Sequence, residues 1–351
     1  MTSAEAEIRK PLLRVLAGER AGRAPFWFMR QAGRYLPEYQ AVRRRKGGFL
    51  EMCRDPAAAA EVTLQPLTRF GMDAAILFSD ILVIPEALGQ GLAFREGEGP
   101  VLEAVGPEPG SLSGLSADGL EARLAPVYEA LDRVAGAVPA ETTVLGFAGA
   151  PWTLATYMVE GGGSRDFLAT KRWAYGDPEG FGGLIDMLVD AVTRHLVAQI
   201  GAGAEAVQIF DTWAGALPER AFEAWSLEPI GRIVRAVRAA CPGTPVIVFP
   251  RGAGALWGRV ATATGADAVS IDTQTPPGFA AREVQPRAVV QGNLDPVMLV
   301  AGGEAMLDEA RYILEALSGG PHVFNLGHGI VPQTPPEHVA ALSALLRGET
   351  G

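Results

Sequence analysis

The chain has 351 residues, of which 48% are hydrophobic and 20% charged, and its formal net charge is −10. This composition is typical of a globular protein with a sizeable core, and the net negative charge argues against general nucleic-acid binding. No apolar run is long enough to span a bilayer, and acids and bases mix within the first ten residues, which excludes a secretory signal. Cys53 and Cys241 lie far apart and match no metal or redox spacing, so we expect two free thiols in a cytoplasmic protein.

The charge is unevenly distributed along the chain. Residues 1–54 hold twelve Lys/Arg and five Asp/Glu, a balance of +7, so the remaining residues together carry −17. Part of the basic excess is the run from Arg43 to Lys46, and such a run by itself is usually a solvated face. Both a solvated role and a role beside a ligand stay open for residues 44–46.

In chain order, a helical lead-in over residues 1–24 precedes a short apolar run over residues 26–29, which we predict to be a buried strand. The run stops at Arg30 and Gln31, and Arg34 follows shortly after. No acidic residue occurs from residue 26 to Arg34, and arginine offers fixed bidentate donors that match carboxylates and phosphates. The sequence therefore predicts an external anion as the partner of Arg30.

Seven further apolar runs follow, with amphipathic stretches between them. The eight predicted strands cover residues 26–29, 74–78, 143–148, 206–210, 246–249, 268–271, 288–291 and 322–326. The predicted helices include residues 56–70, 120–138, 181–200, 218–240, 253–265, 296–317 and a last helix over 335–346. Near-continuous apolar strands that alternate with such helices indicate a parallel sheet covered by helices. Eight units in a chain of this length predict one α/β domain, a (β/α)₈ TIM-type barrel over residues 25–346.

One stretch departs from this alternation. Residues 89–116 are dense in Gly, Glu and Pro, and we predict that they form an insertion after the second strand. Within it, residues 92–94 and 101–103 could pair as a small hairpin near the mouth of the barrel.

Polar residues follow many of the predicted strands, and chemistry in such barrels gathers at these ends. The strand-end positions hold Arg30-Gln31, Ser79-Asp80, Ala150-Pro151-Trp152 with Tyr157 beyond, Asp211-Thr212, Arg251, Asp272, Asn293 and Gly327-His328. Together they predict a ring of polar groups around one pocket, although each alone could be a cap or a turn.

Asp80 has apolar residues on both sides, apart from Ser79. A carboxylate in hydrocarbon is costly unless it pairs with a cation or accepts hydrogen bonds. A helix N-cap is the structural alternative, because Ser and Asp favour that position. The apolar flanks favour a functional role.

His328 lies between Gly327 and Gly329, which would let a ligand approach the backbone and leave the imidazole uncrowded. His195, His322 and His338 have contexts that favour structural or solvated roles. Tyr157 by itself is typical of a core or rim aromatic. The glycine run at residues 161–163 lacks the Gly-Lys-Ser/Thr of a P-loop, and we interpret it as a flexible loop.

These residues carry a family resemblance that runs essentially from end to end of the chain. The sequence resembles the uroporphyrinogen decarboxylase family at Met29-Arg30-Gln31-Ala32-Gly33-Arg34-Tyr35-Leu36-Pro37-Glu38-Tyr39, at Phe78-Ser79-Asp80-Ile81-Leu82, at Gly149-Ala150-Pro151-Trp152-Thr153, at Phe210-Asp211-Thr212-Trp213-Ala214-Gly215 and at Asn325-Leu326-Gly327-His328-Gly329. Many members have a serine where this chain has Thr212, a change that keeps the hydroxyl and adds a methyl.

The resemblance implies a cytoplasmic, homodimeric carboxy-lyase that needs no cofactor or metal. It would convert uroporphyrinogen III to coproporphyrinogen III and CO₂ by removing the carboxyl groups of four acetate side chains, in haem and tetrapyrrole biosynthesis. It places Asp80 and Arg30 in the chemistry. The substrate-binding set that it implies is Arg30, Gln31, Ala32, Gly33, Arg34, Asp80, Tyr157, Thr212 and His328, with Arg43 as a further basic residue near the cleft.

The residues suit that chemistry. Loss of CO₂ leaves electrons that a protonated pyrrole can accept, and Asp80 could accept the pyrrole N–H bonds and stabilise the positive charge. Arg30 is the candidate proton donor or the group that orients the reacting acetate, although its high pKa makes arginine an unusual acid.

Two other functions compete with this interpretation. A zinc-dependent corrinoid methyltransferase would share the fold but needs thiolate and imidazole ligands, and the chain has no His-x-Cys pair. A non-catalytic tetrapyrrole carrier would use the same arginines but would have no use for Asp80. Polar groups that converge at strand ends favour catalysis. We expect a small-molecule substrate, with neither nucleic acid nor membrane as a partner.

Overall fold

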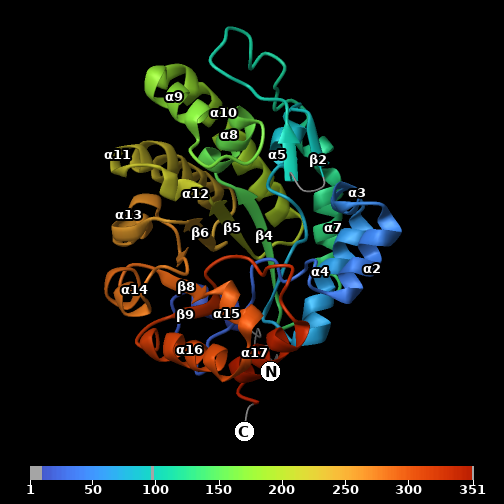
Figure 1. The fold of residues 1–351 in the computed structure, drawn as a ribbon, viewed down its shortest axis with the longest axis vertical. Coiled ribbons are helices and arrows are strands. Elements are labelled where there is room, and N and C mark those ends of the chain that lie inside the picture. The colour runs from blue at the N-terminus through green and yellow to red at the C-terminus, as the bar shows by residue number, and fades with distance from the viewer. Residues whose placement is uncertain (1–9, 96–98, 350–351) are drawn as a thin grey trace, which may run out of the picture.

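A computed structural model describes residues 10–95 and 99–349. Its centre is a curled sheet of seven parallel strands with helices around the outside (Figure 1). The strand order is β1-β4-β5-β6-β7-β8-β9, which is the order of the chain, so each strand pairs with the next one in the sequence after a helical crossover. The strands are β1 (Ala74–Ile76), β4 (Thr143–Gly149), β5 (Ala206–Asp211), β6 (Val246–Pro250), β7 (Ala268–Ser270), β8 (Val289–Leu294) and β9 (His322–Leu326).

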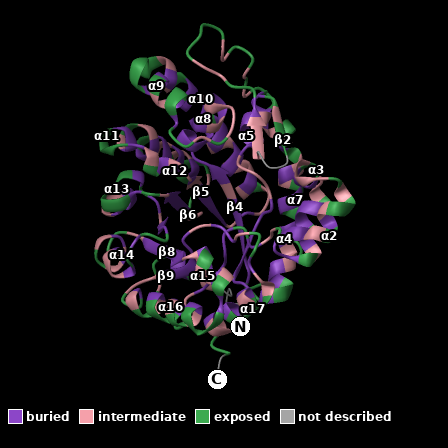
Figure 2. Ribbon diagram, in the orientation of Figure 1, coloured by how far each residue is buried: buried purple, intermediate pink, exposed green. Residues whose placement is uncertain are grey.

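The burial of the strands explains their apolar sequences. Nearly every strand residue in this sheet is buried, and the exposed residues lie in loops and on the outer faces of the helices (Figure 2). A parallel sheet of this kind needs apolar side chains on both faces, because helices cover one face and the side chains in the interior fill the other. The predicted strands from residue 74 onward are therefore confirmed within a few residues at each end.

The predicted first strand at residues 26–29 is wrong as a regular strand, because only Phe26 forms a β-bridge, to Phe324. Side chains take the backbone groups that a ladder would use. The Asp73 carboxylate accepts from Phe26 N at 2.8 Å, and the Asn325 amide oxygen accepts from Met29 N at 3.1 Å. The segment stays extended and buried without a continuous ladder.

This segment nevertheless joins the two edges of the sheet. Phe324 N in β9 donates to Pro25 O at 2.9 Å, and Trp27 N donates back to Phe324 O at 3.4 Å. On the other side, Asp73 N, directly before β1, donates to Phe26 O at 2.9 Å. The segment thus occupies the eighth position between β9 and β1, and Arg30 follows it as the polar residues follow the other strands.

Each predicted amphipathic stretch contains a helix, and the structure adds helices that the sequence pattern did not predict, over Pro37–Lys46, Phe49–Arg54, Val83–Ala87, Pro151–Glu160, Leu168–Gly176 and Pro277–Glu283. The helices are α1 (Pro11–Leu16), α2 (Pro37–Lys46), α3 (Phe49–Arg54), α4 (Pro56–Phe70), α5 (Val83–Ala87), α6 (Leu120–Arg123), α7 (Ala125–Ala135), α8 (Pro151–Glu160), α9 (Leu168–Gly176), α10 (Pro178–Gly201), α11 (Glu219–Phe222), α12 (Glu228–Ala240), α13 (Trp257–Thr264), α14 (Pro277–Glu283), α15 (Pro296–Ala301), α16 (Gly303–Ala316) and α17 (Pro336–Arg347). Short helical turns cover Ala214–Ala216 and Gly254–Leu256, and a π-helix covers Glu223–Leu227.

Some predicted helices are divided. The stretch 120–138 breaks at Leu124, before a proline in the first turn of α7. The stretch 296–317 breaks at Gly302, whose φ of 67° ends α15 and starts α16. Prolines suit a first turn, and a glycine at positive φ ends a helix, so both breaks follow from these residue types. Of the lead-in over residues 1–24, only α1 is helical in the described part, since residues 1–9 lie outside it.

The predicted insertion contains the predicted hairpin. Strands β2 (Leu92–Arg95) and β3 (Gly99–Leu102) pair antiparallel, and Leu92 lies opposite Leu102. The glycine run beside it is held in place, because Leu102 N donates to Gly161 O at 3.0 Å and Gly162 bridges to Val101. No helix in the described part of the chain is long and apolar enough to cross a membrane.

Candidate active site

The turn after the extended segment carries Arg30, which has a left-handed φ of 63°. The next residue fixes the turn. Gln31 is fully buried, its side-chain oxygen accepts from Phe28 N at 3.1 Å, and its side-chain nitrogen donates to Ala74 O in β1 at 2.9 Å. Its backbone N–H donates to Phe28 O, and its carbonyl accepts from the Tyr35 hydroxyl at 2.8 Å. Each hydrogen-bonding group of Gln31 therefore has a partner within the protein, and the residue ties the turn to the sheet.

Arg30 lies against the last strand-end loop. Ile330 N donates to Met29 O at 2.8 Å, which draws the two loops together. A Cβ on Gly329 would come within 2.7 Å of Arg30 Cγ, so the arginine side chain crosses the glycine in close contact. Arg30 is partly accessible to solvent, and the desolvation of its guanidinium by the surrounding protein lowers the Arg30 pKa, an effect that Asp80 opposes.

Asp80 follows β1 and lies within electrostatic reach of Arg30, without forming an ion pair with it. Its side chain is half-buried, and Oδ1 accepts from Leu82 N at 2.8 Å. Burial raises the Asp80 pKa, while the Leu82 N–H and the Arg30 charge act in the opposite direction. The helix α5 begins after Leu82, and no side chain caps it, so Asp80 closes a local turn and is not an N-cap. One carboxylate oxygen has no hydrogen-bond partner among the described residues and can take a ligand.

Tyr157, on α8, belongs to the same group. Burial raises the pKa of its hydroxyl, Asp80 raises it further, and Arg30 lowers it. Its ring lies 6.2 Å from that of Trp213, measured between centroids. The tyrosine therefore lies within electrostatic reach of both Asp80 and Arg30, although they are far apart in the sequence.

His328 is a neutral imidazole near neutral pH. Burial, with the neighbouring Arg30 and Arg251 charges, lowers its pKa to about 4. Its Nδ1 accepts from Gly329 N at 2.7 Å, so the proton of the neutral ring lies on Nε2. The site thus contains a neutral hydrogen-bond donor beside two guanidiniums.

A buried hydroxyl network holds the loop that carries Thr212. The Asp211 carboxylate accepts from the hydroxyls of Thr153 and Ser226, both at 2.6 Å. Thr153 Oγ1 in turn accepts from Trp213 N at 3.1 Å. Burial is the main cause that raises the Asp211 pKa to about 6. Thr212 itself is half-buried, and its hydroxyl makes no hydrogen bond to another described residue.

Arg34, in the turn before α2, and Arg43, on α2, continue the basic side of the site. Arg34 is exposed and lowers the Arg30 pKa, while Arg43 and Arg34 both lower the pKa of the buried Tyr39 hydroxyl, which burial raises to about 12. Neither arginine has an ion-pair partner in the described ranges. Ala32 and Gly33 are half-buried in the turn between Arg30 and Arg34, and a Cβ on Gly33 would lie 3.0 Å from Arg30 O.

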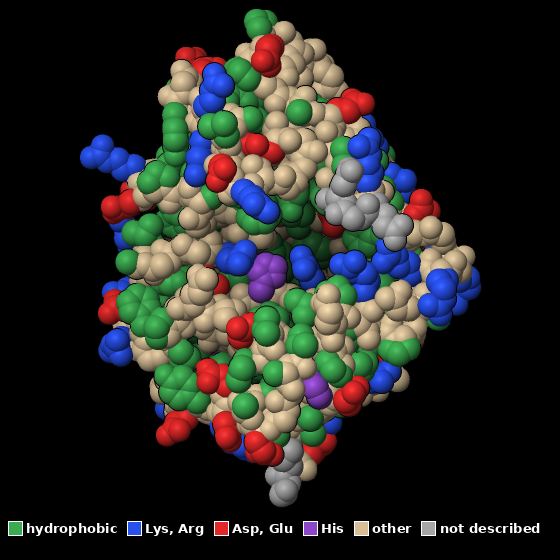
Figure 3. All heavy atoms as spheres, viewed as in Figure 1, with side chains coloured by type: hydrophobic (Ala, Val, Ile, Leu, Met, Phe, Trp, Pro, Cys, Tyr) green, Lys and Arg blue, Asp and Glu red, His purple; other side chains and the backbone are tan. Residues whose placement is uncertain are grey.

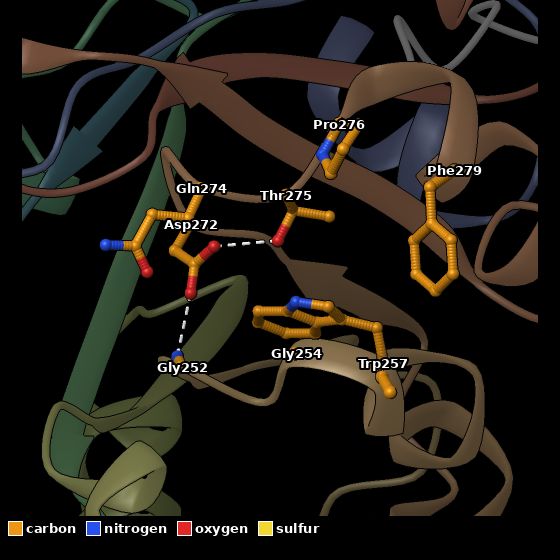
Figure 4. A pocket seen from close by; sticks show the side chains of 9 residues that line it. Gly252, Gly254, Trp257, Asp272, Gln274, Thr275, Pro276 and Phe279 are labelled. Atoms are coloured by element: carbon orange, nitrogen blue, oxygen red, sulfur yellow. Dashed lines mark hydrogen bonds between the residues drawn. The ribbon is translucent and has the colours of Figure 1, made fainter.

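Other predicted strand-end residues have structural partners. The Asp272 carboxylate accepts from Gly252 N and from the Thr275 hydroxyl, both at 2.7 Å (Figure 4). The Asn293 side-chain nitrogen donates to the carbonyls of Asp272 and Thr275. These bonds shape a cavity of about 230 Å³ between the loops after β6 and β7, which also has Trp257 and Phe279 in its wall. None of the residues implied as site residues lines this cavity.

The remaining histidines have the structural surroundings expected for them. His195 and His322 are buried, and His195 contacts the Tyr128 hydroxyl while His322 contacts Gly292 O. His338 contacts Leu299 O. Cys53 and Cys241 are both free thiols. Among the residues that the structure describes, no group of three or more His, Cys, Asp or Glu is placed to hold a metal ion.

The space-filling view shows the resulting electrostatics. On the face in Figure 3, Lys and Arg side chains border a hollow on both sides of a histidine. Arg34, Arg251 and Asp80 all shift the pKa of Arg30, and Arg30 and Arg251 lower that of the neutral His328, so these five side chains lie within electrostatic reach of one another. Elsewhere most arginines are paired, as with Arg194 and Glu121 at 2.6 Å. The external anion that the sequence predicts as the partner of Arg30 stays a prediction, which these guanidiniums without an ion-pair partner among the described residues favour.

The fold and this site define a parallel α/β protein of the barrel class, with a cationic cleft at the carboxyl ends of its strands. A cleft at this end of such a sheet is where enzymes with this architecture place their chemistry. The family model for uroporphyrinogen decarboxylase matches residues 8–348. The chain therefore belongs to the uroporphyrinogen decarboxylase family.

Relatives of known name agree with this assignment. Uroporphyrinogen decarboxylase from Rhodospirillum rubrum is 53% identical over 345 residues, which cover 98% of this chain and 99% of that protein. The enzyme of the same name from Rhizorhabdus wittichii is 54% identical over 348 residues and is covered completely. The match is thus to whole proteins and not to a shared segment.

Solved structures support the fold. A methyltransferase from Methanosarcina mazei has a TM-score of 0.79 and 21% sequence identity, with 96% of this chain and 97% of that one covered. A B12-independent methionine synthase from Shewanella sp. W3-18-1 has a TM-score of 0.57 and 11% identity, over 84% of this chain and 88% of that one. At these identities the likeness concerns architecture alone.

Proposed function

We propose that this chain decarboxylates the four acetate side chains of uroporphyrinogen III and releases coproporphyrinogen III and four molecules of CO₂. The single observation that carries this proposal is the group of guanidiniums without carboxylate partners around the half-buried Asp80. The substrate has eight carboxylates at its rim and four pyrrole N–H donors at its centre. The carboxylates of the substrate match the guanidiniums of the cleft, and its pyrrole N–H groups match the Asp80 carboxylate.

Asp80 accepts hydrogen bonds from the pyrrole N–H groups in this proposal. One of its oxygens already accepts from Leu82 N, which fixes the carboxylate and leaves the other oxygen for the ligand. Arg30 faces Asp80 without pairing with it, so both groups stay available to the substrate. A fixed carboxylate needs no reorganisation when positive charge develops beside it, and such a group is typically worth roughly 3–4 kcal/mol in the transition state.

Each decarboxylation has a balanced course. A proton adds to a ring carbon of the pyrrole, and the bond between the acetate methylene and its carboxylate then breaks. The electron pair of that bond moves into the protonated ring and leaves an exocyclic methylene, while CO₂ departs. A second proton converts the methylene to a methyl group as the ring loses the first one, so one proton is consumed per acetate. Asp80 stabilises the cationic ring, and Arg30 donates the proton or orients the acetate.

The other residues have binding and positioning roles in this proposal. Arg34 and Arg43 take rim carboxylates, and the neutral His328 donates from Nε2. Thr212 supplies a hydroxyl without a hydrogen-bond partner among the described residues, and Tyr157 supplies a hydroxyl beside Trp213. Gln31 acts as a positioning residue, because its buried side chain ties the Arg30 turn to β1. Ala32 and Gly33 have the smallest side chains, so they leave room for the macrocycle to approach the turn.

We also propose one domain over residues 1–351, with the barrel over residues 25–346, that works as a cytoplasmic homodimer without metal or cofactor. The free thiols of Cys53 and Cys241 suit a reducing compartment. The proposed chemistry uses the pyrrole itself as the electron sink, so it requires no cofactor. Membership of the uroporphyrinogen decarboxylase family is the basis for the dimer.

The test is an anaerobic incubation of the purified protein with uroporphyrinogen III, followed by oxidation and chromatography of the porphyrins. We expect loss of the eight-carboxylate species and its conversion, through intermediates, to the four-carboxylate product. Unchanged substrate that stays bound to the protein would identify a carrier and contradict the proposal. Unchanged substrate with a stoichiometric zinc content would favour the methyltransferase alternative.

A further inference from the structure

Arg251 directly follows β6, and the position of this strand places the residue across the site from Arg30. With the segment at residues 26–29 counted as the eighth element, eight elements follow one another around the sheet. Strand β6 is four positions from that segment in either direction. In a ring of eight, four positions is the opposite side. Residues that follow these two elements therefore approach the centre from opposite walls.

The backbone of Arg251 is fixed against the neighbouring loop. Its N–H donates to Asp211 O at 3.1 Å, and its carbonyl accepts from Gly215 N at 2.8 Å. The next residue, Gly252, has a φ of 81°, and a Cβ there would come within 2.8 Å of Gly215 Cα. Close backbone contact thus anchors the Arg251 side chain at its base, and glycine is required at both points of approach.

The side chain of Arg251 reaches the same space as the other charges. Its charge lowers the pKa of Arg30 and of His328, so the guanidinium lies within electrostatic reach of both. The side chain is half-buried, and within residues 10–95 and 99–349 it has neither an ion pair nor a side-chain hydrogen bond. The nearby Asp272 carboxylate bonds to Gly252 N and to Thr275 instead. The Arg251 guanidinium is therefore partly desolvated and lies near the positive Arg30 and the neutral His328, and no carboxylate among the described residues pairs with it.

We propose that Arg251 is a substrate-binding residue that holds a carboxylate of the macrocycle on the wall opposite Arg34. This inference rests on the proposed function. Both arginines could engage one ligand, because a porphyrinogen carries carboxylates on all four pyrroles and spans the cleft. The guanidinium offers a bidentate contact, so it orients the ring as well as attracting it. Arg251 contributes binding and orientation, while Asp80 and Arg30 act on the reacting pyrrole.

The test compares Arg251→Gln with Arg235→Gln in the full chain. Arg235 is an exposed arginine of α12 without an ion pair among the described residues, so it controls for the loss of one positive charge. The readouts are KM and kcat for uroporphyrinogen III and the equilibrium binding of uroporphyrin, which carries the same eight carboxylates. A charge-assisted hydrogen bond lost from the complex should raise KM and weaken uroporphyrin binding about tenfold or more in Arg251→Gln. Arg235→Gln should match the wild type.

Equal KM and equal uroporphyrin binding in the two variants and the wild type would overturn the inference. If Arg251→Gln does not fold, Arg251→Lys keeps the charge but loses the bidentate fork, and its KM should rise several-fold; an unchanged KM would overturn the inference. The failure of the proposed function is separate, because it would appear as a wild-type protein without turnover. In that case the uroporphyrin binding of the variants still decides whether Arg251 holds a carboxylate.

Discussion

Arg30 adopts a left-handed backbone conformation, which for a residue with a side chain typically costs roughly 1–3 kcal/mol. The surrounding hydrogen bonds impose it, because Gln31 N donates to Phe28 O and Ile330 N donates to Met29 O. The result is a guanidinium that leaves the turn toward Asp80 and crosses Gly329. Strain of this kind is typical of functional sites, which agrees with the role proposed for Arg30.

Gly329→Ala should therefore impair function more than folding. A methyl group at this position would overlap the Arg30 side chain and displace the guanidinium from Asp80. We expect kcat/KM for uroporphyrinogen III to fall at least tenfold, while the free energy of unfolding changes by about 1 kcal/mol or less. Gly319→Ala is the matched control, because a Cβ there meets no atom within 4 Å. An activity equal to that of the control would contradict the packing role of Gly329.

At the scale of the element, the loop after β5 depends on a carboxylic acid inside the core. Asp211 is fully buried, and its carboxylate has two hydroxyl partners but no cation among the described residues. Ser226 comes from the π-helix after α11, and Thr153 comes from the first turn of α8. Asp211, at the end of β5, thus links this strand to α8 and to the π-helix. These links hold the loop that carries Thr212 and Trp213 in place.

The raised pKa of Asp211 predicts a specific pH dependence of stability. Its pKa is about 6 in the folded protein against 3.8 ordinarily, so the folded state binds the proton more tightly. The Asp211 carboxyl therefore makes its full contribution to the stability of the fold below about pH 4, and this contribution is lost as the pH rises through 6. The stability of the wild type relative to Asp211→Asn, which cannot ionise, should therefore decrease by about 3 kcal/mol between these limits. Urea unfolding of both proteins at pH 4.5, 5.5, 6.5 and 7.5 measures this difference, and a constant difference would contradict the buried titration.

The elements show what sequence patterns can and cannot predict. Strand β9 and helix α4 have the bounds expected from their apolar patterns, because burial dictates those patterns directly. The segment at residues 26–29 is equally apolar but lacks a ladder, because the side chains of Asp73 and Asn325 take its backbone groups. Those partners are about 50 and 300 positions away, and no local pattern encodes such a contact.

The candidate site likewise contains residues that local sequence predicts and residues that only tertiary contacts identify. Arg30, Asp80 and His328 could be selected from their strand-end positions and apolar or glycine flanks. Arg251 occupies a strand end too, but local sequence did not distinguish it from Asp272, which has internal partners. The order of the strands around the sheet makes the distinction, since it places Arg251 opposite Arg30. The internal bonding of Gln31 likewise follows from tertiary contacts.

At the scale of the whole molecule, one apolar core extends from α1 to α17. Leu12 and Leu346, near the two ends of the described chain, belong to the same cluster of buried side chains as the strands. Most Asp and Glu side chains of the described residues are exposed or half-buried, while the basic N-terminal part contains Arg30, Arg34 and Arg43. The overall negative charge is therefore compatible with the proposed local site for a polyanion.

A continuous core predicts that the barrel and its lead-in unfold together. We expect one endothermic transition in differential scanning calorimetry, because no described segment has a core of its own. Addition of uroporphyrin should raise its midpoint, since a ligand that binds the folded state stabilises it. Two separable transitions would contradict the proposal of one domain over residues 1–351.

Asp80→Asn, assayed anaerobically with uroporphyrinogen III beside Asp118→Asn as an exposed control, tests the central claim most directly. The substitution keeps the shape of the side chain and removes the charge that would stabilise the cationic pyrrole. We predict that kcat falls by at least about a hundredfold, the loss expected for one key electrostatic group, while the chain stays folded and Asp118→Asn keeps full turnover. Wild-type turnover in Asp80→Asn would contradict the account.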